Sequence, residues 1–213
     1  MSTSKGVARD DEFYFQDVVF QAENRLFKVP RHVFLQQSQV FRDMFSLPVP
    51  QDTKPEGMND DSPLILSGVR AIDFSRLLRY LFPVKQISDS FPLKTLDEWT
   101  SVFKLAALWE MEDVKANAIE QMTPLLKKLP AKQVKLSLEY AVEKWLVPGL
   151  NRLVQREEPL DKNDVEMIGW DYALKIMVLR EDCHLSPEWS IERRGEVSMD
   201  CSKEIRVRFN IRD

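Results

Sequence analysis

The chain has 213 residues and a mass of 24.9 kDa, enough for one large domain or for a domain with an extension. Apolar residues make up 44% of the sequence and charged residues 30%, which is typical of a globular protein with an ordinary buried core. The formal net charge of −4 provides no bulk attraction to nucleic acid or to an anionic membrane, so we expect neither as a partner.

A β-hairpin is predicted at the start of the folded chain. Residues 1–11 are small, polar and charged, and we expect a flexible N-terminus there. Residues 13–20 and 26–29 have the composition of two strands, and the polar residues 21–25 between them favour a turn. Pro30 then suits the first position of a helix, where its missing N–H costs nothing.

One helix is predicted to follow, because three phenylalanines and a serine recur with helical spacing. They are Phe34, Ser38, Phe41 and Phe45, at i, i+4, i+7 and i+11. The Ser38 hydroxyl falls on the apolar face, so we expect it to hydrogen-bond a nearby backbone carbonyl. The next segment, residues 46–63, is rich in proline and predicts a loop.

The rest of the first half predicts a short strand and three helices. Residues 64–66 form the strand and residues 72–81 a helix. Thr95-Leu96-Asp97-Glu98 has the form of a capping box ahead of an apolar helical face that reaches Trp109. A helix at 113–126 follows, and Pro124 is expected to kink it or end it early.

The second half is predicted to be almost entirely helical. Apolar faces recur at 134–142, at 150–154 behind a helix start at Pro148, and at 165–179 behind an N-cap at 161–164. Residues 205–209 alternate like a strand. The expected organisation is a flexible segment at 1–11, a first domain at 12–126, a helical extension at 127–186 and a tail of undetermined structure at 187–213.

Few residues are suited to catalysis. Histidine occurs only at His32 and His184, no Gly-x-Ser-x-Gly motif is present, and six glycines form neither a phosphate-binding nor a dinucleotide-binding loop. We therefore expect no enzyme activity and no cofactor. The carboxylates at 157–158 and 181–182 resemble solvated helix ends, and the arginines at 193–194, 206 and 208 lie among acidic residues.

The two cysteines, Cys183 and Cys201, bear on metal binding and on location. Together with the histidines they lack the close ligand pairs of a structural zinc site, so buried or idle thiols are expected and no metal. A secreted disulfide scaffold would carry more cysteines. No apolar run approaches the ~20 residues that cross a bilayer, and residues 1–6 lack a secretory signal's apolar segment. An intracellular protein, cytoplasmic or nuclear, is predicted.

Three runs in order resemble the BTB/POZ family. The first is Asp17-Val18-Val19-Phe20, Leu26-Phe27-Lys28-Val29-Pro30-Arg31, then Ser38, Phe41 and Met44-Phe45. The second is Leu64-Ile65-Leu66, then Phe74, Leu77-Leu78 and Tyr80-Leu81-Phe82, and the third is Lys104 to Met111. The likeness covers about residues 13–125, and the continuation with Lys144-Trp145 and Pro148 is similar to the helical extension of fungal BTB proteins. Pro30 departs from the family, which has a histidine there.

The resemblance implies an α+β fold: a small sheet flanked by a helical cluster, with a mostly helical C-terminal extension. It also implies homodimerisation through the N-terminal strand and the first helix. Phe13, Tyr14 and Phe15 suit such an interface, and covering the domain's own core is the equal alternative. Asp17 and Arg31 correspond to a charged pair at the family's dimer groove. The alternative for them is a surface salt bridge of roughly 0–1 kcal/mol.

Many BTB proteins are substrate adaptors of cullin ubiquitin ligases, which dock through a hydrophobic-x-Glu motif. Leu96-Asp97-Glu98 has that form, although Glu98 also has a capping role. The leading hypothesis is a homodimeric interaction protein that recruits a partner, as a cullin adaptor or as a transcription-linked scaffold. A purely structural self-assembly module and an enzyme of unknown type are the alternatives. The sequence does not identify the protein held by the helical half.

Overall fold

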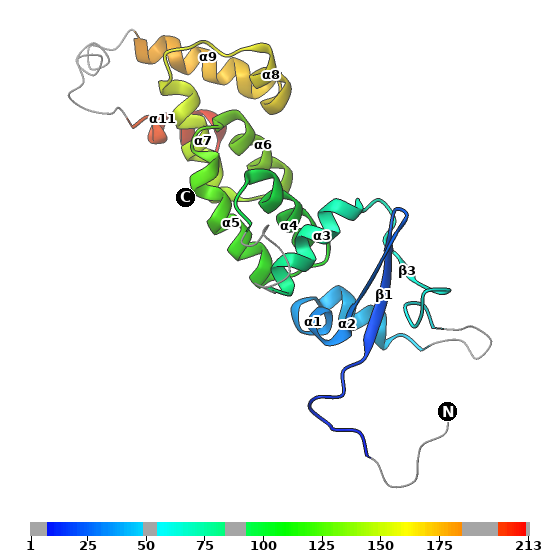
Figure 1. Cartoon of the computed structure of the whole chain (residues 1–213). Coiled ribbons are helices and arrows are strands. Elements are labelled where there is room, and N and C mark those ends of the chain that lie inside the picture. Colours follow the sequence, from blue (N-terminus) through cyan, green and yellow to red (C-terminus); the bar gives the residue numbers. More distant parts are fainter. Residues whose placement is uncertain (1–7, 49–54, 84–92, 185–199, 212–213) are drawn as a thin grey trace. The chain divides into compact units, whose positions relative to one another are not determined.

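The computed structural model describes residues 8–48, 55–83, 93–184 and 200–211 (Figure 1). The chain divides into two compact units, residues 1–122 and 123–213, and the division falls within α5 (Glu112–Leu126). A small sheet and helices make up the first unit, and the described part of the second is helical, so the expected α+β class with a helical C-terminal part is confirmed. Residues 1–7, 49–54 and 185–199 of the predicted N-terminus, loop and tail lie outside the described residues.

The predicted hairpin forms the middle and one edge of the sheet. β1 (Asp17–Ala22) pairs antiparallel with β2 (Arg25–Pro30), with Phe20 opposite Phe27, and parallel with the short β3 (Leu64–Ile65). The strand order is β2-β1-β3. Because β1 is central, its residues 18–20 are buried. The Glu23 carboxylate at the hairpin turn accepts the Ala71 N–H at 2.9 Å, which ties the hairpin to the start of α3 (Ala71–Leu81).

The single helix predicted across Ser38 is wrong: the chain forms two helices, α1 (Arg31–Gln37) and α2 (Gln39–Ser46). Ser38 between them has extended backbone, and its hydroxyl accepts the Phe41 N–H at 3.2 Å, as an N-cap does. The same hydroxyl donates to the Trp109 carbonyl at 2.5 Å. The expected carbonyl partner exists, but it lies 71 positions away. Because Ser38 caps the start of α2, α1 ends there. Helical spacing of apolar residues alone does not reveal such a break.

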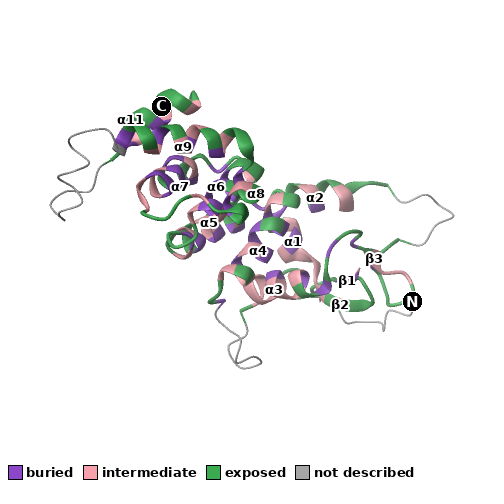
Figure 2. Ribbon diagram, turned by 90° about the horizontal axis from the view of Figure 1, so that it is seen from above, coloured by how far each residue is buried: buried purple, intermediate pink, exposed green. Residues whose placement is uncertain are grey.

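An aromatic cluster forms the core of the first unit. Its five rings contact one another with centroids 4.9 to 6.3 Å apart; they are Phe20, Phe34, Phe41, Phe74 and Trp109. The cluster joins the central strand to α1, α2, α3 and the end of α4 (Leu96–Leu108). Most of the contacts are edge-to-face or tilted, the arrangement that ring quadrupoles favour. In Figure 2 the buried residues lie on the faces that elements turn toward one another.

The second unit packs helices around an aliphatic core. Its elements are α6 (Pro130–Tyr140), α7 (Glu143–Gln155), α8 (Lys162–Ile168), α9 (Trp170–His184) and α11 (Ser202–Phe209). The core cluster includes Val134, Leu150 and Ile176. The predicted start of a helix at Pro148 is wrong, because α7 begins at Glu143 and Pro148 lies inside it.

The strand predicted at 205–209 is also wrong, since this segment is α11. The alternation of Ile205, Val207 and Phe209 fits a helix equally well, because Ile205 and Phe209 are four positions apart and share a face. Ile205 is buried in the core cluster, Phe209 contacts the Tyr172 ring at 5.0 Å, and Val207 is exposed. Packing against α9 therefore determines the structure of this segment.

We predict that Ser38→Ala lowers the free energy of unfolding by about 1–3 kcal/mol, because it leaves a buried carbonyl and a buried N–H without partners. The matched control is Ser46→Ala at the end of α2, where the exposed hydroxyl donates to the Arg42 carbonyl at 2.7 Å. We expect that change to stay within about 0.5 kcal/mol. Urea unfolding followed by circular dichroism measures both, and equal effects would contradict the role of the Ser38 hydroxyl.

Candidate protein-interaction surfaces

Three adjacent aromatic side chains lie exposed just before β1. Phe13, Tyr14 and Phe15 are 69%, 56% and 51% exposed. The Asp10 carboxylate accepts the Phe13 N–H at 2.6 Å, and Phe15 stacks on the His32 ring at 4.5 Å. The segment is thus locally organised, and it runs outward from the start of β1 (Figure 1). These rings do not cover the domain's own core, which the buried aromatic cluster already fills.

Asp17 and Arg31 lie close to this segment but make separate contacts. The Asp17 carboxylate is 3.8 Å from the Lys28 ammonium in an exposed ion pair. Arg31 donates from Nη2 to the Phe45 carbonyl at 3.3 Å, and its guanidinium carbon lies 4.1 Å from the Phe45 ring centroid. Among the described ion pairs none joins Asp17 to Arg31, so the expected pairing within one chain is not found. The hairpin geometry explains the Lys28 contact. Pro30 lies opposite Asp17 on the neighbouring strand, and Lys28 is two residues before Pro30, so the side chains of Lys28 and Asp17 are on the same face of the hairpin.

Two buried nitrogens at the start of α1 have no hydrogen-bond partner among the described residues. They are Nε of Arg31 and Nδ1 of His32. Buried polar atoms in native proteins are nearly always paired. His32 stacks on Phe15 of the exposed segment, whereas the Arg31 guanidinium lies over the Phe45 ring. The start of α1 therefore lies next to exposed apolar area and contains two buried nitrogens without a partner among the described residues.

The predicted capping box at Thr95–Glu98 is present. The Thr95 hydroxyl accepts the Glu98 N–H at 3.2 Å, and the Glu98 carboxylate accepts the N–H groups of Lys94 and Thr95 at 3.0 and 3.1 Å. The Arg79 guanidinium lies 3.7 Å from Glu98. Burial raises the pKa of Glu98, but these hydrogen bonds and the Arg79 charge outweigh it and hold the pKa below the usual glutamate value. Leu96 is half-buried on the same turn.

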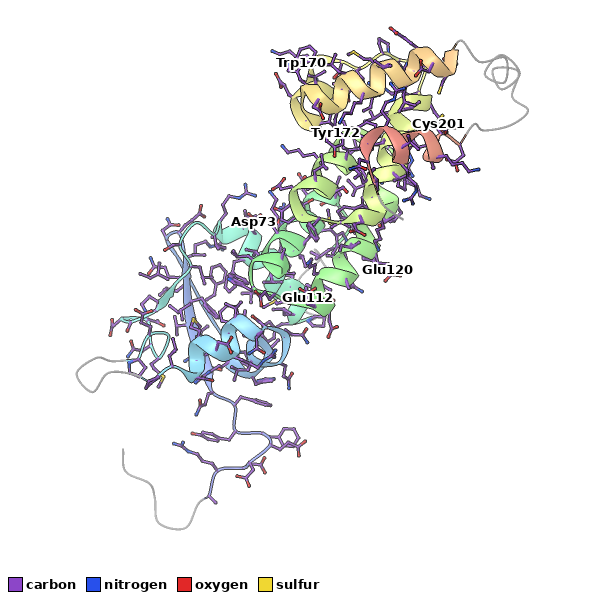
Figure 3. All side chains as sticks on the ribbon, turned by 180° about the vertical axis from the view of Figure 1, so that it is seen from behind. Asp73, Glu112, Glu120, Trp170, Tyr172 and Cys201 are labelled. Carbon is purple, nitrogen blue, oxygen red and sulfur yellow. The ribbon has the colours of Figure 1, made fainter. Side chains whose placement is uncertain are left out.

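Asp73 joins α3 to the helix that carries this motif. Its carboxylate accepts the Ser101 hydroxyl at 2.6 Å from α4 and forms an ion pair with Arg70 at 2.8 Å. Burial raises the pKa of Asp73. The hydrogen bonds from Arg70 and Ser101 and the charges of Arg70 and Arg76 lower this pKa by more, so it lies below the usual aspartate value. The two helices are thus joined by a hydrogen bond between their side chains, and Figure 3 shows Asp73 on α3.

The second unit exposes an apolar stripe on α9. Trp170, Leu174 and Val178 recur every four residues and are 67%, 54% and 43% exposed. The opposite face, with Ala173, Ile176 and Leu179, is buried as the sequence predicts. The outward stripe was missed because helical spacing of apolar residues normally indicates a buried face. The presence of two separate apolar faces in the sequence of α9 is the signal that could have revealed the exposed stripe.

Residues 8–124 match the family model of the BTB/POZ domain, which covers more than half of the chain. The chain belongs to the BTB/POZ domain family. The BTB/POZ domain is a protein–protein interaction module, not a catalytic one. A search of the curated proteins found no match to this chain.

Within the BTB/POZ domain lie both the N-terminal aromatic segment and the Leu96–Glu98 motif, whereas the α9 stripe lies outside it. Across the described ranges, no group of three or more histidine, cysteine, aspartate or glutamate side chains is arranged to hold a metal ion. The described helices also include none with the length and apolar character to cross a bilayer.

We predict that Glu98→Gln lowers the free energy of unfolding at pH 7 by about 1 kcal/mol, since glutamine keeps the capping form but loses the charge. Because the pKa of Glu98 is lowered in the folded BTB/POZ domain, its contribution is complete above the unfolded value of about 4.3. It is lost as the pH falls through the lower folded value. Urea unfolding between pH 7 and the acid range should show the difference from wild type shrinking.

The control is Glu120→Gln, at an exposed position of α5 in the same domain (Figure 3). It should change stability by less than about 0.5 kcal/mol at every pH. A pH-independent loss in Glu98→Gln would contradict the charge-based account.

Proposed function

We propose that this BTB/POZ protein homodimerises through its N-terminal edge and recruits a partner protein without catalysis, in the cytoplasm or nucleus. The observation that carries the proposal is the exposure of Phe13, Tyr14 and Phe15 side by side. An aromatic side chain buries about 150–250 Å² when it is covered. Three neighbours with half or more of their surface exposed form an apolar patch of the kind that marks interfaces.

The polar groups beside the patch support the same proposal. The Asp17 carboxylate is exposed and can accept further hydrogen bonds. A two-fold dimer places the same patch of each copy face to face. In our proposal Asp17 and Arg31 act as a charged pair between copies rather than within one chain. Such a pair favours specificity of docking more than affinity.

The first expected result is a dimer in solution. Size exclusion with light scattering should give a mass near twice 24.9 kDa, because the aromatic patch is covered only in the pair. The triple variant Phe13→Ser, Tyr14→Ser, Phe15→Ser should be monomeric. Its control is Trp170→Ser, which removes an exposed ring from the second unit and should leave the dimer intact. A monomeric wild type at tens of micromolar would overturn the dimer proposal.

Recruitment of a cullin scaffold is the finer form of the proposal. Leu96-Asp97-Glu98 begins α4 in the hydrophobic-x-Glu form. The Glu98 carboxylate is occupied by the capping box and by Arg79, so Leu96 is the residue of the motif that remains for direct contact. The alternative is a transcription-linked or purely structural scaffold without a ligase role.

Isothermal calorimetry with the purified N-terminal region of a cullin separates these two roles. We expect wild type to bind and Leu96→Glu to weaken binding at least about tenfold, because a charge replaces an apolar contact. Ile65→Glu, at an exposed position of β3, is the control and should bind like wild type. If the wild-type protein binds no cullin tested, the adaptor role is rejected and the scaffold alternative stands.

The helical unit is proposed to contact the recruited partner. The α9 stripe supports this, since an apolar helix face that the unit's own core does not use is available for another protein.

A further inference from the structure

The only two cysteines of the chain lie in contact with each other. Cys183 is on α9 and Cys201 precedes α11, and both are buried. Their sulfur atoms are 3.6 Å apart. A disulfide bond measures about 2.05 Å, so the two sulfurs are in van der Waals contact and unbonded. Eighteen positions separate them in sequence, so their meeting is a product of the fold.

Cys201 is held in place by α7. The Asn151 side chain accepts the Cys201 N–H at 3.1 Å and donates to the Asp200 carboxylate at 3.1 Å. The same carboxylate accepts the Ser202 N–H at 3.0 Å and its hydroxyl. Hydrogen bonds from Ser202 hold the pKa of Asp200 below its usual value, so the carboxylate that organises this turn is ionised near neutral pH.

Contacts along α11 hold it against α9. Arg208 forms an ion pair with Asp182 at 2.8 Å, next to Cys183. The Phe209 ring contacts Tyr172 at 5.0 Å, and Lys175 lies 5.6 Å from the Phe209 centroid. Figure 3 shows Tyr172 and Cys201 in this part of the second unit. The two sulfurs are thus brought together by contacts on both sides of them.

Packing alone does not require two cysteines here. A buried thiol behaves as a small apolar group, and alanine, serine or valine would fill similar space. A metal site needs further ligands, and among the described residues no third histidine, cysteine or carboxylate completes one. What distinguishes this pair is that the two thiols of the chain face each other at contact distance.

We propose that Cys183 and Cys201 form a reversible disulfide that fastens α11 to α9. The oxidant is a low-molecular-weight disulfide such as oxidised glutathione. One thiolate attacks a glutathione sulfur, forming a mixed disulfide and releasing one glutathione thiolate. The second thiolate then attacks the protein sulfur of the mixed disulfide and releases the other. The two protein thiols lose two electrons, oxidised glutathione is reduced, and the two thiol protons end on the released glutathione molecules.

Access to the buried sulfurs comes from local opening of α11. This helix has only eight residues, and in our proposal it opens locally and transiently from α7 and α9 while the rest of the unit stays folded. Oxidation should therefore be slow relative to that of an exposed thiol. Once formed, the bond closes a loop from residue 183 to residue 201 and restricts the unfolded chain, which stabilises the unit. In a reducing compartment such a bond forms only when the glutathione pool becomes oxidised, as redox-sensing disulfides do.

The test exposes the full-length protein to oxidised glutathione under native conditions. Intact mass spectrometry should show the loss of two hydrogens, and digestion without reductant should give one peptide pair that joins Cys183 to Cys201. The thermal midpoint of the helical unit should rise by more than about 5 °C and should return with dithiothreitol. Cys183→Ala and Cys201→Ala should show no oxidation-dependent rise, and the wild-type mass data remain decisive if either variant fails to fold.

Three outcomes would overturn the proposal. Both thiols of the native protein could stay reduced while those of the urea-unfolded protein oxidise. Glutathione could instead remain attached as a stable mixed disulfide, which shows that the second step fails. Disulfide-linked dimers on a non-reducing gel, in place of the internal bond, would show that the sulfurs react between chains. None of these results bears on the dimer proposal, whose N-terminal surface contains no cysteine.

Discussion

The buried aromatic cluster around Phe20 is the constraint on which the rest of the BTB/POZ domain depends. It joins the central strand to α1, α2, α3 and the end of α4, and the hydrogen bond from Ser38 to Trp109 secures it from a distant part of the chain. A closely packed core accepts no further large ring without strain. The aromatic residues at 13–15 lie outside this core and are exposed.

The BTB/POZ domain thus has a buried aromatic core and an exposed aromatic edge, and we propose the edge as its interaction surface. The edge offers the exposed aromatic area of Phe13, Tyr14 and Phe15 and the exposed Asp17 carboxylate. At the start of α4, by contrast, every polar group of the capping box is paired, and Asp73 binds that helix to α3. In our proposal a partner covers the apolar area of the first surface, whereas the second surface presents a preformed shape to its partner.

Local rules predicted much of this fold, and long-range contacts account for the rest. The hairpin, the capping box and the inward face of α9 follow from turn chemistry and periodicity, which act within a few residues. The break at Ser38 depends on a carbonyl 71 positions away, and α11 depends on packing against α9. At the N-terminal edge, the interface residues expected from the sequence stay a prediction, and Asp17 pairs with Lys28 rather than with Arg31 in the chain. Cross-strand geometry decided that exchange, and a linear sequence does not display it.

In our proposal the exposed aromatic segment of one chain lies on the same region of a second chain. A photo-crosslinking amino acid placed at Tyr14 can test this contact, because it reacts only with groups next to it. We expect covalent dimers in which residue 14 of one copy is joined to the segment 13–31 of the other. Crosslinks confined within a single chain, or dimers joined elsewhere, would contradict it.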